Sequence, residues 1–191
     1  GNNIISTATI SATGNISGGN LSVNSGSISA GTLTVSNILN GGANATGNIG
    51  NSTNYFNTVF AKATSAQYAD LAENYLADAW YTAGTVVVFG GENEVTIATQ
   101  HADTKVAGVI SEKPSYLMNG DLIAVHSATI ALQGRVPVKV TGPVAKGDML
   151  VSAQDGRATA CAEPRVGSVI GKSLENFSGE SGIIEMVVGR D

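Results

Sequence analysis

Residues 85–98 read Thr-Val-Val-Val-Phe-Gly-Gly-Glu-Asn-Glu-Val-Thr-Ile-Ala, two runs rich in β-branched residues on either side of a glycine pair. Valine, isoleucine, threonine and phenylalanine favour a pleated, half-buried strand. Glycine reaches the positive φ angles that tight hairpin turns require. The segment therefore predicts a β-hairpin.

Short apolar runs continue beyond the hairpin, and turn signals such as Gly147-Asp148, Asp155-Gly156 and Gly179 to Gly182 lie among them. The runs are 106–110, 122–125, 129–132, 136–140, 149–152, 169–170 and 183–188. Closely spaced strands with no long helical pattern indicate an all-β barrel or sandwich. We assign this domain to residues 82–191, and about 110 residues suffice for an independent core.

The opening part of the chain, residues 1–61, contains no Asp, Glu, Lys, Arg or His. Aliphatic residues recur there at short intervals with glycine between them, and Leu33-Thr34-Val35 alternates apolar and polar as a half-buried strand does. The phrase Thr-Gly-Asn-Ile occurs at 13–16 and again at 46–49. This pattern predicts a repetitive β-structure, in preference to a flexible low-complexity linker.

A single copy of residues 1–61 has too few large apolar side chains to offset the entropy lost on ordering. One strand-turn ribbon also leaves its edges unpaired. Several identical chains wound together bury the aliphatic side chains along a shared axis, and a homotrimer is the simplest such geometry. We therefore predict a trimeric β-helical or β-spiral fibre shaft. The alternative, a single-chain β-solenoid, has too few coils to stack and cap.

Residues 62–81 form a junction in which aromatic and charged residues first occur together. Thr64 and Gln67 have the spacing of a capping box. The residues that follow at helical spacing are Tyr68, Leu71, Ala72 and Tyr75. The pattern predicts a short amphipathic helix over residues 66–75.

The composition excludes several classes of protein. The formal charge is −5 and the pI is near 4.9, whereas nucleic-acid binding needs clustered Lys and Arg, so we expect no nucleic-acid partner. No apolar run is long enough for a membrane-spanning helix, so we expect no membrane insertion. Cys161 has no partner cysteine, and His101 and His126 lie in no metal-ligand pattern. We predict neither a metal nor another cofactor.

The search for catalytic groups yields few candidates. Asp70 and Glu73 are three residues apart and share a face of the predicted helix, as a paired-carboxylate or cation site or as an ordinary polar face. His126 and Ser127 are adjacent on a predicted strand, so their side chains point to opposite faces and we expect a hydrogen-bonded structural histidine. Trp80 and Tyr81 either stack on a sugar or fill the interface between helix and barrel.

Four stretches carry a resemblance to a known class of protein. Residues 50–61 (GNSTNYFNTVFA) resemble the shaft-to-tip junction of bacteriophage tail fibres, with Asn54 where arginine is common. Residues 69–75, 84–96 and 134–151 resemble the C-terminal domain of virion structural proteins of T4-like phages, notably cyanophages. They are also similar, more distantly, to the intramolecular-chaperone domains of phage appendages, some of which cleave themselves off.

The resemblance implies a virion structural protein, a trimeric tail or appendage fibre with a terminal domain implicated in host attachment. Its implied partners are two further copies, other virion tail or baseplate proteins, and a host surface glycan or protein. One alternative is an intramolecular chaperone with autoproteolytic release, for which Ser65, Asp70 and Glu73 are candidates. No catalytic residue of a self-cleaving family matches position by position, so we do not predict an enzyme. A further alternative is a capsid or collar decoration fibre with no receptor role.

Overall fold

The computed structural model describes residues 13–14, 29–43, 46–51, 53–61 and 69–189. The chain divides into two units, Gly1–Phe60 and Ala61–Asp191. We describe each unit by itself.

The described residues of the first unit form no helix and no strand. Their hydrogen bonds are local and centre on asparagine side chains. Asn51 Oδ1 accepts the backbone N–H groups of Thr53 at 3.0 Å and Asn54 at 2.8 Å, and Asn40 Oδ1 accepts that of Gly42 at 3.0 Å. These are Asx turns, in which the side chain replaces a backbone acceptor. The predicted pairing of strands between copies of the shaft stays a prediction.

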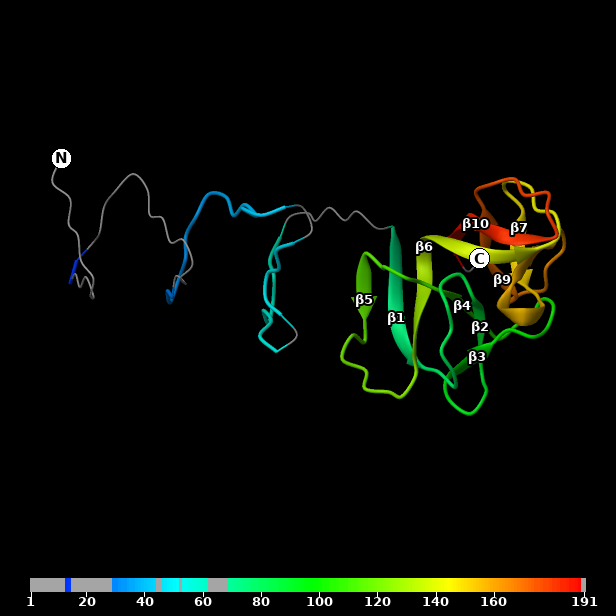
Figure 1. The fold of residues 1–191 in the computed structure, drawn as a ribbon, viewed down its shortest axis with the longest axis horizontal. Coiled ribbons are helices and arrows are strands. Elements are labelled where there is room, and N and C mark those ends of the chain that lie inside the picture. The colour runs from blue at the N-terminus through cyan, green and yellow to red at the C-terminus, as the bar shows by residue number, and fades with distance from the viewer. Residues whose placement is uncertain (1–12, 15–28, 44–45, 52, 62–68, 190–191) are drawn as a thin grey trace. The chain divides into compact units, whose positions relative to one another are not determined.

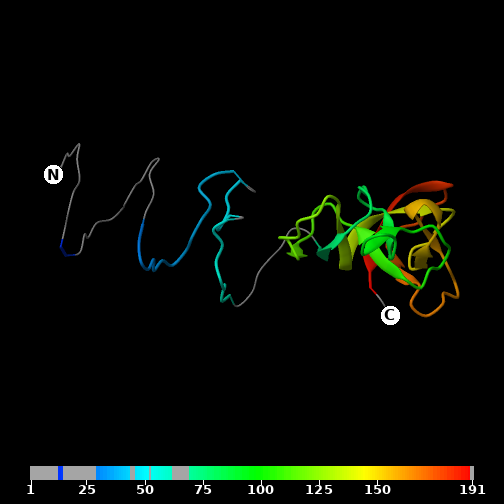
Figure 2. The ribbon, with the colours of Figure 1, turned by 90° about the horizontal axis from the view of Figure 1, so that it is seen from below.

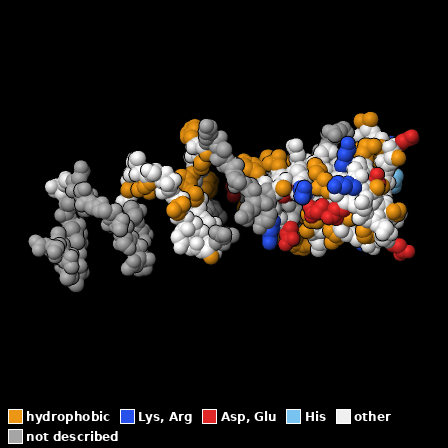
Figure 3. Space-filling model, turned by 90° about the horizontal axis from the view of Figure 1, so that it is seen from above, with side chains coloured by type: hydrophobic (Ala, Val, Ile, Leu, Met, Phe, Trp, Pro, Cys, Tyr) orange, Lys and Arg blue, Asp and Glu red, His pale blue; other side chains and the backbone are white. Residues whose placement is uncertain are grey.

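Every large apolar side chain in the described part of the first unit is exposed. Orange hydrophobic side chains are visible on the face of this part that Figure 3 shows. The exposed fraction runs from 49% for Val35 to 97% for Phe60. The set comprises Leu33, Val35, Ile38, Leu39, Ile49, Tyr55, Phe56, Val59 and Phe60. In a single copy of the chain, the described part of this unit therefore has no apolar core.

The second unit is built from strands, as Figure 1 shows. In chain order they are β1 Asp70–Leu76, β2 Val86–Phe89, β3 Val95–Ile97, β4 Val106–Ile110, β5 Tyr116–Met118, β6 Ser127–Thr141, β7 Met149–Ser152, β8 Ala158–Ala160, β9 Val169–Ser173 and β10 Ser181–Val188. A short 3-10 turn, Gln154–Gly156, joins β7 to β8. Figure 2 shows the same unit from below.

The 15-residue strand β6 organises the sheet. Its first half pairs antiparallel with β1 and β4, and its second half pairs antiparallel with β10 and parallel with β8. From β10 the pairing continues through β9 and β7 to β8, and so returns to β6. These five strands form a closed barrel, and β4, β2 and β3 extend the sheet from the other half of β6.

Two clusters of buried side chains form the core. The larger cluster includes Val136, Val138, Val140, Leu150, Ile170, Ile184 and Met186, from the barrel strands. The smaller one joins Val87, Val95, Ala107, Ile110, Ala128 and Ile130. Burying each large aliphatic side chain contributes about 1.5–3 kcal/mol. The larger cluster also contains Val86, Val88, Val106 and Val109 of β2 and β4, so one face of the extension shares the core of the barrel.

The structure confirms the all-β class and the hairpin on which it depends. β2 and β3 pair antiparallel, with Val87 opposite Ile97, Val88 opposite Thr96 and Phe89 opposite Val95. The predicted strand at 106–110 has the bounds of β4. The second unit is a barrel with a sheet extension, which agrees with the barrel alternative.

Some of the predicted strands were wrong in their bounds. Residues 129–132 and 136–140 belong to one strand, β6, because Gly134 and Pro137 are accommodated within it. Residues 122–125 form no strand, and β5 and β8 were not predicted. These two strands have three residues each, too few for an alternating pattern to stand out.

The helix predicted over residues 66–75 is wrong where the structure describes it. Residues 70–76 form β1, which pairs with β6 on one side and with β5 on the other. Burial along β1 alternates, with Asp70, Ala72 and Asn74 buried, as a strand requires. Helical spacing over so short a segment is a weak preference, and pairing on both edges overrides it. The capping residues Thr64 and Gln67 lie outside the described residues.

Gly134 of β6 lies opposite Asp70 of β1, close to the backbone at the start of that strand. Its φ is 107°, which side chains disfavour, and a Cβ added there would lie 2.1 Å from the Ala69 carbonyl oxygen. The Arg135 N–H donates to that same carbonyl oxygen at 3.1 Å. Only glycine fits between the strands at this point.

We predict that Gly134→Ala destabilises the full chain by about 2–4 kcal/mol, through steric overlap and backbone strain. Urea unfolding followed by circular dichroism measures the loss. Gly120→Ala is the matched control, because a Cβ there meets nothing within 4 Å. Equal stability of the two variants would contradict the close approach of β1 and β6.

Candidate functional site

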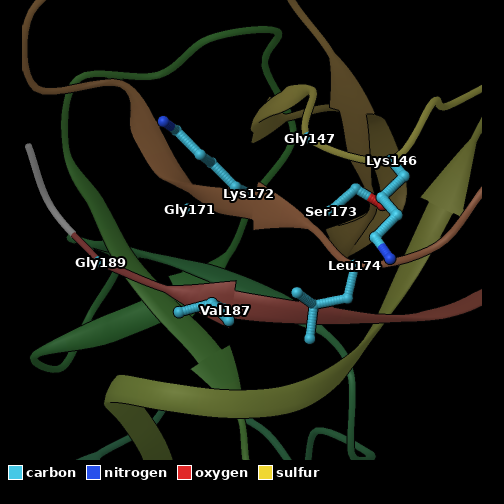
Figure 4. Close-up of a pocket in the computed structure, with 8 residues that line it drawn as sticks. All are labelled: Lys146, Gly147, Gly171, Lys172, Ser173, Leu174, Val187 and Gly189. Carbon is cyan, nitrogen blue, oxygen red and sulfur yellow. The ribbon is translucent and has the colours of Figure 1, made fainter.

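A pocket of about 390 Å³ opens between β9, β10 and the turn that precedes β7. Two lysines, Lys146 and Lys172, lie on different sides of it in Figure 4. The remaining lining residues are Gly147, Gly171, Ser173, Leu174, Val187 and Gly189. All charged side chains of this lining are basic, although the chain as a whole is acidic.

The turn that carries Lys146 is fixed by hydrogen bonds. Asp148 Oδ2 accepts the backbone N–H of Ala145 at 2.8 Å, and Asn176 Oδ1 accepts that of Lys146 at 2.8 Å. Gly147 has a φ of 93° and donates its N–H to the Ser173 carbonyl oxygen at 2.9 Å. The backbone conformation of the turn that carries Lys146 is therefore fixed by contacts within the protein.

Lys172 is the fourth of the five residues of β9, with Met149 opposite it on β7 and Val187 opposite it on β10. Its neighbour Gly171 is buried, and a Cβ there would come within 2.8 Å of Met186 Cε in the core. Alternation along the strand directs Lys172 to the solvent side, where it is exposed.

Two further hollows adjoin this pocket. One, of about 360 Å³, shares Gly147 and Lys172 and adds Asp148, Met149, Ala160, Cys161 and Ala162. The other, of about 520 Å³, is lined by Pro143, Val144, Ala145, Asp148, Asn176, Phe177 and Ser178. The turn at residues 145–148 therefore borders three hollows.

Lys146 and Lys172 are cationic residues in a lining that also carries the apolar side chains of Leu174 and Val187. Such a lining suits an anionic group carried on an apolar frame. Within the described residues, no three His, Cys, Asp or Glu side chains are grouped so that they could hold a metal ion. In the described part of the chain there is also no helix long and apolar enough to cross a membrane.

Sequence reasoning did not find this pocket. Lys146 and Lys172 are brought together by the pairing of β7 with β9, and neither residue has a local pattern around it that indicates a ligand. Glycine beside each lysine is the only local signal, and glycine beside a strand usually marks a turn.

The candidate residues Asp70 and Glu73 do not share a face. They are three positions apart on β1, so their side chains point to opposite sides of the strand. Asp70 is 4% exposed and its Oδ2 has no hydrogen-bond partner among the described residues. Glu73 accepts the Tyr75 hydroxyl at 2.8 Å. The prediction that Asp70 and Glu73 share a helical face was therefore wrong. The third candidate, Ser65, lies outside the described residues. A self-cleaving role stays a prediction.

Trp80 does not fill an interface within the second unit, where it is 72% exposed. Its ring meets that of His126 edge-on, with centroids 5.3 Å apart and planes at 77°. His126 Nδ1 is buried without a hydrogen-bond partner in the described residues, so the expected hydrogen-bonded histidine is not found. Tyr81, by contrast, packs against the smaller core cluster.

Asp78 forms a polar cluster with Tyr81. The Tyr81 hydroxyl donates to Asp78 Oδ1 and accepts the Ile97 backbone N–H at 3.2 Å. Burial acts to raise the pKa of Asp78, but hydrogen bonds from Tyr81, Thr96 and its own backbone, with the charge of His126, bring that pKa below its ordinary 3.8. Burial and then the bond to Asp78 raise the pKa of Tyr81 above its ordinary 10.0.

Comparison with known proteins finds a distant similarity among solved structures. No protein-family model matches the chain, and no curated protein matches it. Among solved structures, the chain is similar to the crystal structure of the head fiber gp8.5 N base in bacteriophage phi29. The identity is 15%, the TM-score is 0.42, and the similarity covers 63% of this chain and 95% of that one.

We predict that Asp78→Asn lowers the stability of the full chain near neutral pH. Because folding lowers the Asp78 pKa, its contribution is present above the ordinary value of 3.8 and is lost as pH falls through the folded pKa. The difference between wild type and Asp78→Asn should therefore shrink in acid. Thermal unfolding across the acid range measures it, with Asp121→Asn as the exposed-loop control. A difference independent of pH would contradict the ionised hydrogen-bonded carboxylate.

Proposed function

We propose that this chain is a structural protein of a bacteriophage virion, a homotrimeric fibre located on the tail or another appendage. In this proposal the first unit is the shaft, and the second unit is a terminal domain that takes part in host attachment. Support comes from the resemblance of residues 50–61, 69–75, 84–96 and 134–151, and from the physical properties of the two units.

The observation that carries the proposal is the exposure of all nine large apolar side chains in the described part of Gly1–Phe60. Single exposed apolar residues are ordinary, but a whole segment whose apolar side chains all face water indicates an interaction surface. A shaft formed from several chains removes these side chains from water.

Copies of the same chain are the best-suited partners. The shaft segment has no charged side chains, so identical chains side by side meet no like-charge repulsion. Backbone groups at open edges pair between chains, and asparagine, serine and threonine side chains face water. Three chains close around one axis, which is why we propose a homotrimer.

The second unit contributes binding. The pocket of Lys146 and Lys172 suits an anionic group on the host surface, as a glycan or a protein displays. A trimer presents three such pockets, so that weak individual contacts add through effective concentration. Other virion tail or baseplate proteins are the proposed partners that hold the fibre on the particle.

We predict that the purified full chain has three times the mass of the 19.3 kDa protomer in light scattering. Replacing Leu33 and Val35 together by aspartate should shift that mass toward the single chain, because it places charge at the buried positions of the shaft. Thr34→Asp, on the polar side of the same stretch, is the matched control. A wild-type mass of one protomer would overturn the fibre.

We predict that the Lys146→Ala, Lys172→Ala double variant binds an immobilised carboxylate-bearing polysaccharide about tenfold more weakly than wild type, since two charge-assisted contacts are lost. Elution by a salt gradient measures the change. The Lys105→Ala, Lys113→Ala double variant loses the same charge elsewhere and serves as the control. Equal loss in both double variants would indicate net charge alone and would contradict the pocket.

A further inference from the structure

The tryptophan of the second unit is exposed although a large apolar ring normally contributes to a core. Trp80 is the single tryptophan of the chain, and 72% of it faces water. Indole rings of this kind are typical of binding surfaces, because they offer large area at little cost in conformational entropy.

The indole ring is held in place. Its edge-on contact with His126 orients it, and His126 is itself tied to the chain before Trp80, since its carbonyl oxygen accepts the Ala77 N–H at 3.0 Å. In an edge-on contact only one of the two rings presents its face, so at least one face of the indole stays uncovered by His126. The ring is therefore an oriented platform.

Asp78 is linked to this platform through His126. Its carboxylate interacts electrostatically with His126, the ring that Trp80 contacts. The Tyr81 hydroxyl fixes the carboxylate through a hydrogen bond to Oδ1. The Thr96 side chain also hydrogen-bonds this carboxylate. Gly91 lies beside Oδ2, where a Cβ would come within 3.0 Å of that oxygen. The carboxylate is therefore fixed in place, and an incoming donor has to approach a lone pair that these hydrogen bonds leave free.

The loop between β2 and β3 lies against the segment that carries Asp78 and adds negative charge to it. Glu94 Oε2 accepts the Leu76 N–H at 2.7 Å, and the Asn93 side chain donates to the Ala77 carbonyl oxygen at 2.9 Å. These bonds hold the loop against the segment that leads to Asp78. Glu92, Glu94 and Asp78 make the surroundings acidic, which disfavours an anionic ligand.

We infer that Trp80, Asp78 and His126 form a binding site for a saccharide ring without anionic groups, separate from the pocket of Lys146 and Lys172. The apolar C–H face of a sugar ring stacks on the open face of the indole, and sugar hydroxyls donate to the Asp78 carboxylate. This site adds a ligand class to the proposed attachment role. The inference depends on the proposed function only in assuming that the saccharide belongs to the host surface.

The fluorescence of Trp80 tests this inference directly, because no other tryptophan contributes. The full chain is titrated with neutral oligosaccharides of glucose, galactose and mannose and, separately, with an acidic oligosaccharide of glucuronate. We expect a saturable change in emission with at least one neutral sugar, and at least tenfold weaker binding of the acidic one. Asp78→Asn should weaken the neutral sugar about tenfold, and Tyr116→Ala, an exposed aromatic on β5, should leave its binding unchanged.

Two outcomes would overturn the inference. In the first, none of the neutral saccharides changes the fluorescence emission of Trp80, and calorimetry also detects no binding. The other is emission already blue-shifted and shielded from acrylamide, which would mean that another copy of the chain covers Trp80. Light scattering on the same sample separates this test from the test of the fibre. A trimer that binds no sugar would contradict only the saccharide site. A single chain that binds sugar would contradict only the proposed fibre.

Discussion

The pairing of β6 on both of its edges is the constraint on which the second unit depends. One continuous strand of 15 residues takes part in the barrel through β8 and β10 and in the sheet extension through β1 and β4. Its buried residues alternate regularly in the second half, so a register slip of one residue would move Val136, Val138 and Val140 out of the core. Gly134 lets β1 approach this strand closely.

Both candidate binding sites follow from that arrangement. The lysine pocket exists because β9 and β10 close the barrel against β6, which sets Lys172 between Met149 and Val187. The Trp80 platform lies where the chain leaves β1 and where His126 leads into β6. In both candidate sites the side chains proposed to contact a ligand lie on short loops or on the exposed face of a strand. The hydrogen-bonded strands hold these loops and faces in position, as is common for binding residues.

The sequence alone predicted the parts of this structure that local patterns determine. The hairpin at residues 85–98 has β-branched runs and a glycine pair, and both signals act over a few residues. The helix over residues 66–75 failed because its apolar spacing extends over too few turns to outweigh strand pairing, and two of the three buried residues of β1, Asp70 and Asn74, are polar. Nothing near Lys146 or Lys172 indicates that they line one pocket, since strand pairing alone brings them together. The sequence singled out Trp80 as a residue that either stacks on a sugar or fills an interface. Its exposure could not be predicted, because it depends on the tertiary structure that places its ring against His126.

The central claim is that residues 1–61 acquire their structure from other copies of the chain. Hydrogen exchange of the backbone amides at residues 29–61 in the full-length assembly tests this claim most directly. The account predicts slow exchange there that becomes fast when the assembly is diluted to single chains. Fast exchange in the assembly, at the rate of an unstructured peptide, would contradict it.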